Sequence, residues 1–247
     1  MKIGLCSITF RQLDIRSIVK LAVEATLDGI EWGGDKHVPP GELNTARQTA
    51  LTTQKAGLEV SSYGSYYRTG SLTHEHEFDA ILATAVALQA PSIRVWAGEK
   101  GSVDATAEDR KRVVSDAQRI ATLAQVEGIA VHFEYHGGTL TDTKESAQGL
   151  MVAVDHPNVG LYWQPAVGLP VEQRVQSIRL LLPYLTHVHV FQWHGTDRLP
   201  LSAGEEDWAT YLHALNNKQR YAMLEFVKND DPAQFIEDAK VLRGLLS

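Results

Sequence analysis

Residues 130–138, AVHFEYHGG, begin as a buried strand and end as a polar loop. An apolar run is followed by a carboxylate at Glu134, an imidazole at His136 and two glycines. Short apolar runs that end in glycine are typical of strands inside a parallel sheet. We therefore expect a core strand that carries Glu134 at its carboxyl end and leads into a loop at the ligand-facing rim.

Similar apolar runs recur along the chain, and a helical pattern follows each of them. Residues 14–25 place apolar side chains at helical spacing, and residues 107–128 form a longer pattern of the same kind. A last helix is expected at 231–246, with Asp231 as N-cap and Pro232 at the first helical position. The predicted strands are residues 2–8, 29–32, 58–63, 92–97, 129–134, 160–164, 187–193 and 222–226.

Eight strand–helix units at a spacing of roughly 30 residues have the period of βαβ crossovers. In 247 residues they predict an α/β protein with a (β/α)8 TIM-barrel fold, as one domain over residues 1–247. A doubly wound open sheet is the main alternative. It would need no eighth unit, and no Gly-x-Gly-x-x-Gly motif follows the first strand.

Composition limits the classes of partner. The formal net charge is −7 and the isoelectric point is about 5.8, which argues against an electrostatic grip on nucleic acid. Cys6 is the only cysteine, so no intrachain disulfide can form, which fits a reducing compartment. No stretch approaches the ~18 apolar residues of a membrane span, and the start lacks a signal-peptide pattern. We expect a cytoplasmic protein with no membrane and no nucleic-acid partner.

Polar residues end or nearly end the last four predicted strands. A single Glu at such a position is usually solvated, but four polar side chains on adjacent strand ends would be costly to bury without a partner. Two carboxylates, an imidazole and an amide oxygen suit one divalent metal ion such as Mn²⁺, Mg²⁺, Co²⁺ or Zn²⁺. The four candidate ligands are Glu134, Gln164, His189 and Glu225.

Three further polar residues are candidates for substrate binding. His136 can donate to a substrate oxygen, or it can cap its own loop. Arg94 lies inside the fourth predicted strand, where a buried charge needs a partner such as a carboxylate of the site. Arg198 lies on the long loop after the seventh strand, where it would either hold a substrate hydroxyl or phosphate or be solvated.

The second strand leads into a glycine-rich loop that carries His37, and loops at this end of a barrel commonly contact substrate. Trp32, Trp96 and Trp163 fall at strand ends. They predict either an aromatic wall for a sugar ring or core packing. Trp32 and His37 are therefore included among the candidate substrate-binding residues.

Several of these segments resemble the sugar phosphate isomerase/epimerase family, the xylose isomerase-like TIM barrels. This group includes ketose 3-epimerases, hydroxypyruvate isomerases and, more remotely, endonuclease IV. The resemblance covers nearly the whole chain. The matching segments are GIEWGGDKHVPPG (29–41), SIRVWAG (92–98), FEYHGG (133–138), LYWQP (161–165), HVHVFQW (187–193) and LEFVKND (224–230).

The resemblance implies metal ligands at the same four positions, Glu134, Gln164, His189 and Glu225. The family ligand on the sixth strand is typically Asp, whereas this chain has Gln164. Two glutamates balance a divalent ion to zero, so we expect the ion to be held less tightly and to act as a stronger Lewis acid.

The implied activity is removal of a proton next to a carbonyl, through a cis-enediolate, on a sugar or sugar phosphate. Glu134 and Glu225 are the implied catalytic bases. Bases on opposite faces would give an epimerase, and one base shuttling between adjacent carbons would give an isomerase. The sequence does not choose between them.

Three alternatives remain at this point. A non-catalytic sugar-binding barrel could have lost its metal through Gln164. An endonuclease IV-like nuclease would need a multi-zinc cluster and many more ligands. Hydrolysis of an activated ester or lactone is a residual option. Related barrels often form dimers or tetramers, and the sequence leaves open whether this chain is a homo-oligomer.

Overall fold

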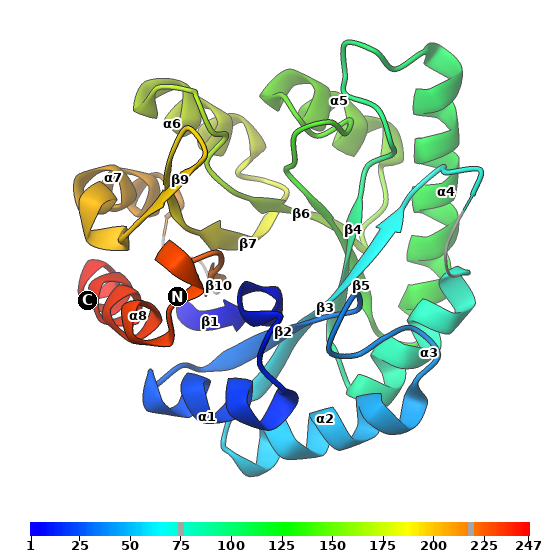
Figure 1. The fold of residues 1–247 in the computed structure, drawn as a ribbon. Coiled ribbons are helices and arrows are strands. Elements are labelled where there is room, and N and C mark those ends of the chain that lie inside the picture. Colours follow the sequence, from blue (N-terminus) through cyan, green and yellow to red (C-terminus); the bar gives the residue numbers. More distant parts are fainter. Residues whose placement is uncertain (74–76, 217–219) are drawn as a thin grey trace.

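Eight parallel strands close into a barrel that helices surround, as the computed structural model shows (Figure 1). The structure describes residues 1–73, 77–216 and 220–247. Strand order around the wall is β1-β10-β7-β6-β5-β4-β3-β2, so the predicted (β/α)8 TIM barrel is confirmed. The barrel strands are β1 (Lys2–Cys6), β2 (Gly29–Gly33), β3 (Glu59–Arg68), β4 (Ser92–Trp96), β5 (Ala130–Glu134), β6 (Val159–Trp163), β7 (Leu185–Val190) and β10 (Tyr221–Leu224).

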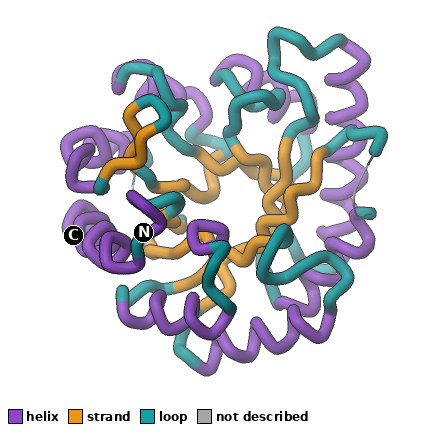
Figure 2. The backbone as a smooth tube through the Cα atoms, viewed as in Figure 1, coloured by secondary structure: helices purple, strands orange, loops and turns teal. Residues whose placement is uncertain are grey.

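The helices form the outer layer, with the strands inside them (Figure 2). The last helix begins as predicted, because the Asp231 side chain accepts from the Ala233 amide and Pro232 takes the first turn. None of the helices in the described part of the chain is long and apolar enough to cross a membrane. The helices are α1 (Ile15–Glu24), α2 (Leu43–Lys55), α3 (Phe78–Leu88), α4 (Ala107–Val126), α5 (Lys144–Val154), α6 (Val171–Leu181), α7 (Glu205–Ala214) and α8 (Pro232–Leu246), with short 3₁₀ turns η1 (Ser7–Phe10), η2 (Leu201–Gly204) and η3 (Lys228–Asp230).

The seventh strand is shorter than predicted. Residues 187–193 read as one apolar run, but β7 ends at Val190 and the chain leaves the barrel. It then forms a small antiparallel hairpin from β8 (Gln192–His194) and β9 (Asp197–Leu199). The hairpin places residues 192–199 outside the barrel wall, and the Gln192 side chain lies against Gly204, where an added Cβ would overlap it.

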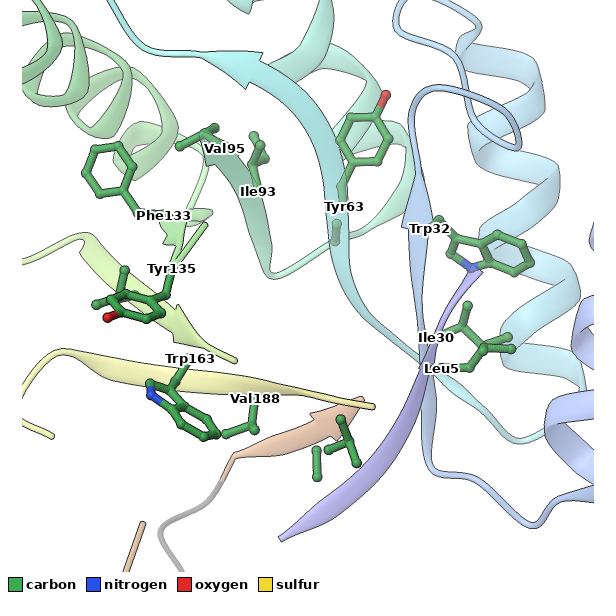
Figure 3. Packing of buried hydrophobic residues seen from close by; sticks show 14 of the residues in the cluster. Leu5, Ile30, Trp32, Tyr63, Ile93, Val95, Phe133, Tyr135, Trp163 and Val188 are labelled. Carbon is green, nitrogen blue, oxygen red and sulfur yellow. The ribbon is translucent and has the colours of Figure 1, made fainter. Parts of the chain in front are cut away.

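Strand alternation divides the apolar residues into two cores. Side chains such as Ile30, Val95 and Phe133 belong to the large core between the barrel wall and the helices (Figure 3). Their neighbours along each strand point the other way, into the barrel. The small inner cluster consists of Cys6, Ile8, Tyr162, Tyr221 and Met223.

Below the strand tips, aromatic and imidazole rings fill the barrel interior. His187 lies between Tyr162 and Tyr221, at ring-centroid distances of 4.9 and 5.7 Å, and it also meets His132 at 5.7 Å. The Tyr221 amide donates to His187 Nδ1. Burial lowers the pKa of His187 to about 4 and that of His132 well below its ordinary value. We call these four residues the floor cluster, and its imidazoles are neutral at pH 7.

Candidate functional site

Four side chains from consecutive strands of the wall meet at the carboxyl ends of the barrel, which we call the mouth. His189 Nδ1 lies 3.4 Å from Glu134 Oε1, 3.3 Å from Glu225 Oε2 and 3.2 Å from Gln164 Oε1. Glu134 ends β5, His189 lies in β7, and Gln164 and Glu225 directly follow β6 and β10. The structure therefore brings together all four residues that the sequence proposed as metal ligands.

A buried guanidinium lies beneath these four side chains. Arg94 Nε donates to Glu31 Oε1 at 2.8 Å, and Arg94 Nη1 donates to Glu134 Oε2. The same Glu134 oxygen accepts from Trp96 Nε1 at 2.6 Å. Gly64 leaves room for this pair, since a Cβ there would lie 2.7 Å from Arg94 Nη2. Arg94 is 2% exposed and pairs with two carboxylates, so the expectation that it binds substrate directly is corrected to a role below the pocket.

The guanidinium keeps both of its carboxylates ionised. Burial alone would raise the pKa of Glu134, but Arg94 together with His189 and His136 outweighs burial and holds that pKa below its ordinary value. Burial also raises the pKa of Glu31, but Arg94 together with His189 and Ser62 outweighs burial and lowers that pKa. Two fully buried carboxylates therefore carry charge at neutral pH, which is expensive unless each has a charged partner.

His189 faces different groups with its two ring nitrogens. Nδ1 points to the oxygens of the mouth, whereas Nε2 is buried, lacks a hydrogen-bond partner among the described residues and lies 3.9 Å from Glu31 Oε1. Burial lowers the pKa of His189, but Cys6 and Glu225 raise it, and the result is well above the ordinary value. Burial also raises the pKa of the Cys6 thiol. The nearby Glu134 and Glu225 carboxylates therefore favour positive charge at this point, and a proton or a metal cation can supply it.

The donor set fits one hard or borderline divalent cation. Three buried carboxylates and one guanidinium carry a net charge of −2, which a divalent ion balances. Nδ1 already faces three oxygens, and Nε2 faces Glu31 as the imidazole of a metal-bound histidine commonly faces a carboxylate. The residues that can hold the ion are Glu134, Gln164, His189 and Glu225.

A pocket of about 620 Å³ opens directly above three of these groups, Glu134, Gln164 and Glu225. Its sides come from the loops after β5 and β6 and from aromatic side chains near the hairpin. His136 lines the pocket, 5.0 Å from the Trp96 ring. Its Nδ1 lies 2.6 Å from the Gly137 carbonyl oxygen and donates to it, which leaves Nε2 available to a ligand.

Two of the tryptophans proposed as an aromatic wall belong to the outer core instead. Trp32 is fully buried and donates to Thr53 on α2 at 3.2 Å, and Trp163 is fully buried and donates to Ser177 on α6 at 2.9 Å. Figure 3 shows both rings within that core. The prediction that Trp32 contacts substrate is wrong because its neighbour Glu31 points inward, and adjacent strand residues face opposite ways.

His37 and Arg198 also have partners within the chain. His37 is 6% exposed, with Nδ1 3.1 Å from Ser7 Oγ and Nε2 3.2 Å from the Leu13 carbonyl oxygen. Both ring nitrogens are occupied, so the predicted substrate contact is corrected to a role in fixing the loop after β2. Arg198 forms a partly exposed ion pair with Asp230, and its contact with a substrate hydroxyl or phosphate stays a prediction.

Residues that the sequence reasoning missed form one side of the pocket. Phe191, Trp193 and Phe226 line it together, and Trp193 lies 5.3 Å from Phe191 and 5.8 Å from Phe226 between ring centroids. Phe226 directly follows Glu225, so its position beside the pocket could be predicted from its place next to a candidate ligand. The sequence predicts Trp193 at the end of a continuous strand, and it shows no clear signal for the hairpin that places Trp193 beside the pocket.

Comparisons with known proteins agree with this architecture. The family model described as xylose isomerase-like TIM barrel matches residues 19–245. A 3-dehydroshikimate dehydratase from Bacillus anthracis is 26% identical, over 98% of this chain and 96% of its own length. That protein is an enzyme by its name.

Solved structures show the same fold at lower identity. A probable 3-DHS dehydratase from Bacillus anthracis, involved in petrobactin synthesis, has a TM-score of 0.82 at 24% identity and covers 98% of this chain and 99% of its own. A 3-keto-D-glucoside 4-epimerase from E. coli has a TM-score of 0.74 at 21% identity, with 99% and 98% covered. A D-psicose 3-epimerase from Clostridium cellulolyticum H10 has a TM-score of 0.73 at 15% identity, with both chains fully covered.

Proposed function

This chain belongs to the xylose isomerase-like TIM-barrel family, and from this premise we propose that it is a metal-dependent sugar isomerase or epimerase. It would remove a proton from a carbon next to a carbonyl group and return it. One observation carries the proposal: the convergence of His189 Nδ1 with oxygens of Glu134, Gln164 and Glu225 beneath an open pocket. Names of the compared relatives support it, because they include epimerases that act on sugars.

The four convergent residues would hold the ion. When bound, a divalent cation supplies Lewis-acid stabilisation to the negative charge that develops on the carbonyl oxygen. Arg94 and Glu31 keep the charge around the ligands balanced and orient Glu134 from below. The apolar and aromatic sides of the pocket exclude water from the reacting carbons.

Glu134 and Glu225 would divide the proton transfers between them. Glu134 Oε2 already accepts from Arg94 and Trp96, so only its Oε1 faces the mouth. The Glu225 carboxylate accepts no hydrogen bond from another described residue, and its Oε2 faces His189. We assign removal of the carbon-bound proton to Glu225. In an isomerase Glu225 would return that proton to the adjacent carbon. In an epimerase Glu134, which is ionised at rest, would first take up a proton from water and deliver it from the other side. His136 Nε2 would contact a substrate oxygen at the rim.

A dehydratase is the second candidate, and a specific observation favours it. The relative named 3-dehydroshikimate dehydratase matches nearly the whole chain. Its class of reaction would share the first step, loss of a proton next to a carbonyl. Hydroxide would then leave from the next carbon, so that water is lost and a conjugated double bond forms. The same base, Glu225, would serve both reactions.

The nuclease alternative is less well supported. Such chemistry needs a cluster of several metal ions. In residues 1–73, 77–216 and 220–247, the two groups that could hold an ion, Cys6–Glu31–His189 and Glu134–His189–Glu225, share one imidazole. A neutral imidazole has one free lone pair, so both groups cannot use it at once.

A panel of ketoses, aldoses and cyclic keto acids in deuterated water with Mn²⁺ tests the proposal. Deuterium in recovered or epimerised sugar supports an isomerase or epimerase, whereas an ultraviolet-absorbing enone supports the dehydratase. The variants Glu134→Gln and Glu225→Gln should each abolish exchange, and Glu172→Gln, on the exposed start of α6, should not. Absence of bound metal together with absence of exchange would instead support a non-catalytic binding barrel.

A further inference from the structure

The pocket above the mouth offers little to a negatively charged substrate. Among its lining residues, Asp142 and Glu145 add acidic groups beyond the ligand set. Lys144 is the one Lys or Arg among them, and its Nζ lies 2.9 Å from Glu145. Even with a divalent ion balancing the buried charges, the rim carries more acid than base, so a carboxylate or phosphate finds no unpaired cation there.

The arginines around the pocket are already engaged. Arg94 is buried between two carboxylates, and Arg198 pairs with Asp230. Arg68 stacks 4.2 Å from the Trp96 ring centroid and donates to the Gly98 carbonyl. Recognition of an anion usually needs a guanidinium free to form a bidentate contact. The described arginines nearest the mouth are not free in this way.

Aromatic side chains, in contrast to these charged groups, cover one side of the pocket. Phe191, Trp193 and Phe226 form a continuous aromatic surface that we call the aromatic wall. Arg198 lies 4.8 Å from the Phe226 ring centroid and 5.6 Å from that of Trp193, so it braces the wall. A wall of this kind suits the apolar face of a ring, and it begins beside Glu225, next to the reacting carbons.

Trp193 differs from the other tryptophans in how its indole N–H is used. Trp32, Trp96, Trp163 and Trp208 each donate to a protein oxygen. Trp193 Nε1 has no hydrogen-bond partner in the described part of the chain. Buried indole N–H groups normally have an acceptor, so hydrogen bonds fix the other four tryptophans, whereas only contacts of the ring with Phe191, Phe226 and Arg198 hold Trp193.

We infer that the substrate is uncharged and has two rings, a keto-sugar ring over the mouth and a second ring that packs on Trp193. This inference rests on the proposed function for the first ring only. It names a substrate class, an uncharged glycoside, that differs from the acid named for the dehydratase relative. The geometry makes Trp193 the specificity-determining residue and the acidic rim the element that rejects anions.

Calorimetric titration with three probes tests the inference, with and without Mn²⁺. Phenyl β-D-glucopyranoside should bind about tenfold more tightly than D-glucose, which lacks the second ring, and than phenyl β-D-glucuronide, which adds a charge. Trp193→Ala should remove most of the preference over glucose and leave Mn²⁺ affinity within about twofold. Equal or tighter binding of the glucuronide by the wild-type protein would overturn the inference, as would an unchanged preference in Trp193→Ala.

A second variant separates the inference from folding effects. Gln173 is exposed and lines the pocket, so Gln173→Lys adds a cation without removing packing. It should raise the affinity for phenyl glucuronide about threefold or more and leave the glucoside unchanged. No gain for the glucuronide would count against charge as the basis of selectivity. If the protein binds the glucoside as expected but binds no Mn²⁺, the proposed function fails and the two-ring preference stands.

Discussion

The two ends of the barrel interior handle charge in opposite ways. At the mouth, Arg94 lies between Glu31 and Glu134, with all three side chains at most 4% exposed. At the opposite end, where the strands begin and which we call the floor, Lys2 and Glu59 form an ion pair. Their side chains are 52% and 56% exposed. The same kind of pair is therefore solvated at one end and fully desolvated at the other.

This difference in solvation between the two ion pairs indicates which end of the barrel binds a ligand. Buried ion pairs are weak sources of net stability, because desolvation offsets most of the attraction. A barrel selected for stability alone would fill both ends with apolar or neutral groups, as the floor cluster does with His132 and His187. Charge is concentrated at the mouth, where it can compensate a bound cation.

Removal of the mouth guanidinium should have the largest effect. Arg94→Met leaves Glu31 and Glu134 buried without their partner, and we expect a loss of about 3–5 kcal/mol in the free energy of unfolding. Urea denaturation at pH 7 measures it. Arg198→Met is the matched control, since that pair is partly exposed and should change stability by less than about 1 kcal/mol. Equal losses in the two variants would show that burial does not distinguish the mouth.

Lowering the pH should test whether His187 of the floor cluster is neutral in the folded chain. The pKa of His187 is about 4 in the folded chain, below its ordinary value, so the unfolded chain takes up a proton first as pH falls. Stability from this residue is therefore constant above about pH 6.5 and declines below it, by about 2 kcal/mol at pH 5. His187→Gln cannot titrate and retains an acceptor for the Tyr221 amide. Its stability should fall less between pH 7.5 and 5, and identical declines would contradict the assignment.

Most of the fold and the centre of the site could be predicted from the sequence. Eight apolar runs at a regular period specify the barrel, and the carboxyl ends of four of them identify Glu134, Gln164, His189 and Glu225. This works because strand ends in a barrel are fixed by covalent geometry and sheet register. A residue at a strand tip needs no side-chain detail to be placed.

The errors arise where side-chain direction matters. The sequence offers Trp32 and Trp163 as aromatic residues that contact a sugar ring. Each is adjacent to an inward-facing polar residue, so the alternation of side chains along a strand directs both rings towards the helices. The ion pair of Arg198 with Asp230 and the position of Trp193 in the pocket could not be predicted, since both residues lie on a hairpin that leaves the barrel after Val190. Ion pairing between distant strands, such as Arg94 with Glu31, follows only from the closed wall.

A change in charge at the mouth sharpens the comparison while an oxygen ligand is kept at position 164. Gln164→Asp adds a third carboxylate to the proposed ligands, and we expect Mn²⁺ to bind about tenfold more tightly. Isothermal titration at pH 7.5 measures the affinity. Gln173→Asp places the same charge in the pocket away from the strand tips, so its effect should stay within about twofold. Unchanged or weaker binding in Gln164→Asp would count against Gln164 as a ligand.

The smallest effect is expected at the floor ion pair. Lys2→Met removes the pair with Glu59, but both side chains are half exposed and Glu59 still accepts from the Tyr221 hydroxyl at 2.6 Å. The free energy of unfolding should change by less than about 1 kcal/mol, and the difference should vanish in ~1 M salt, because screening acts on solvated charges. The loss in Arg94→Met should persist at the same salt concentration, since water and ions do not reach that pair. Should salt abolish both differences, the mouth would be as solvated as the floor, and the electrostatic argument for a cation there would lose its basis.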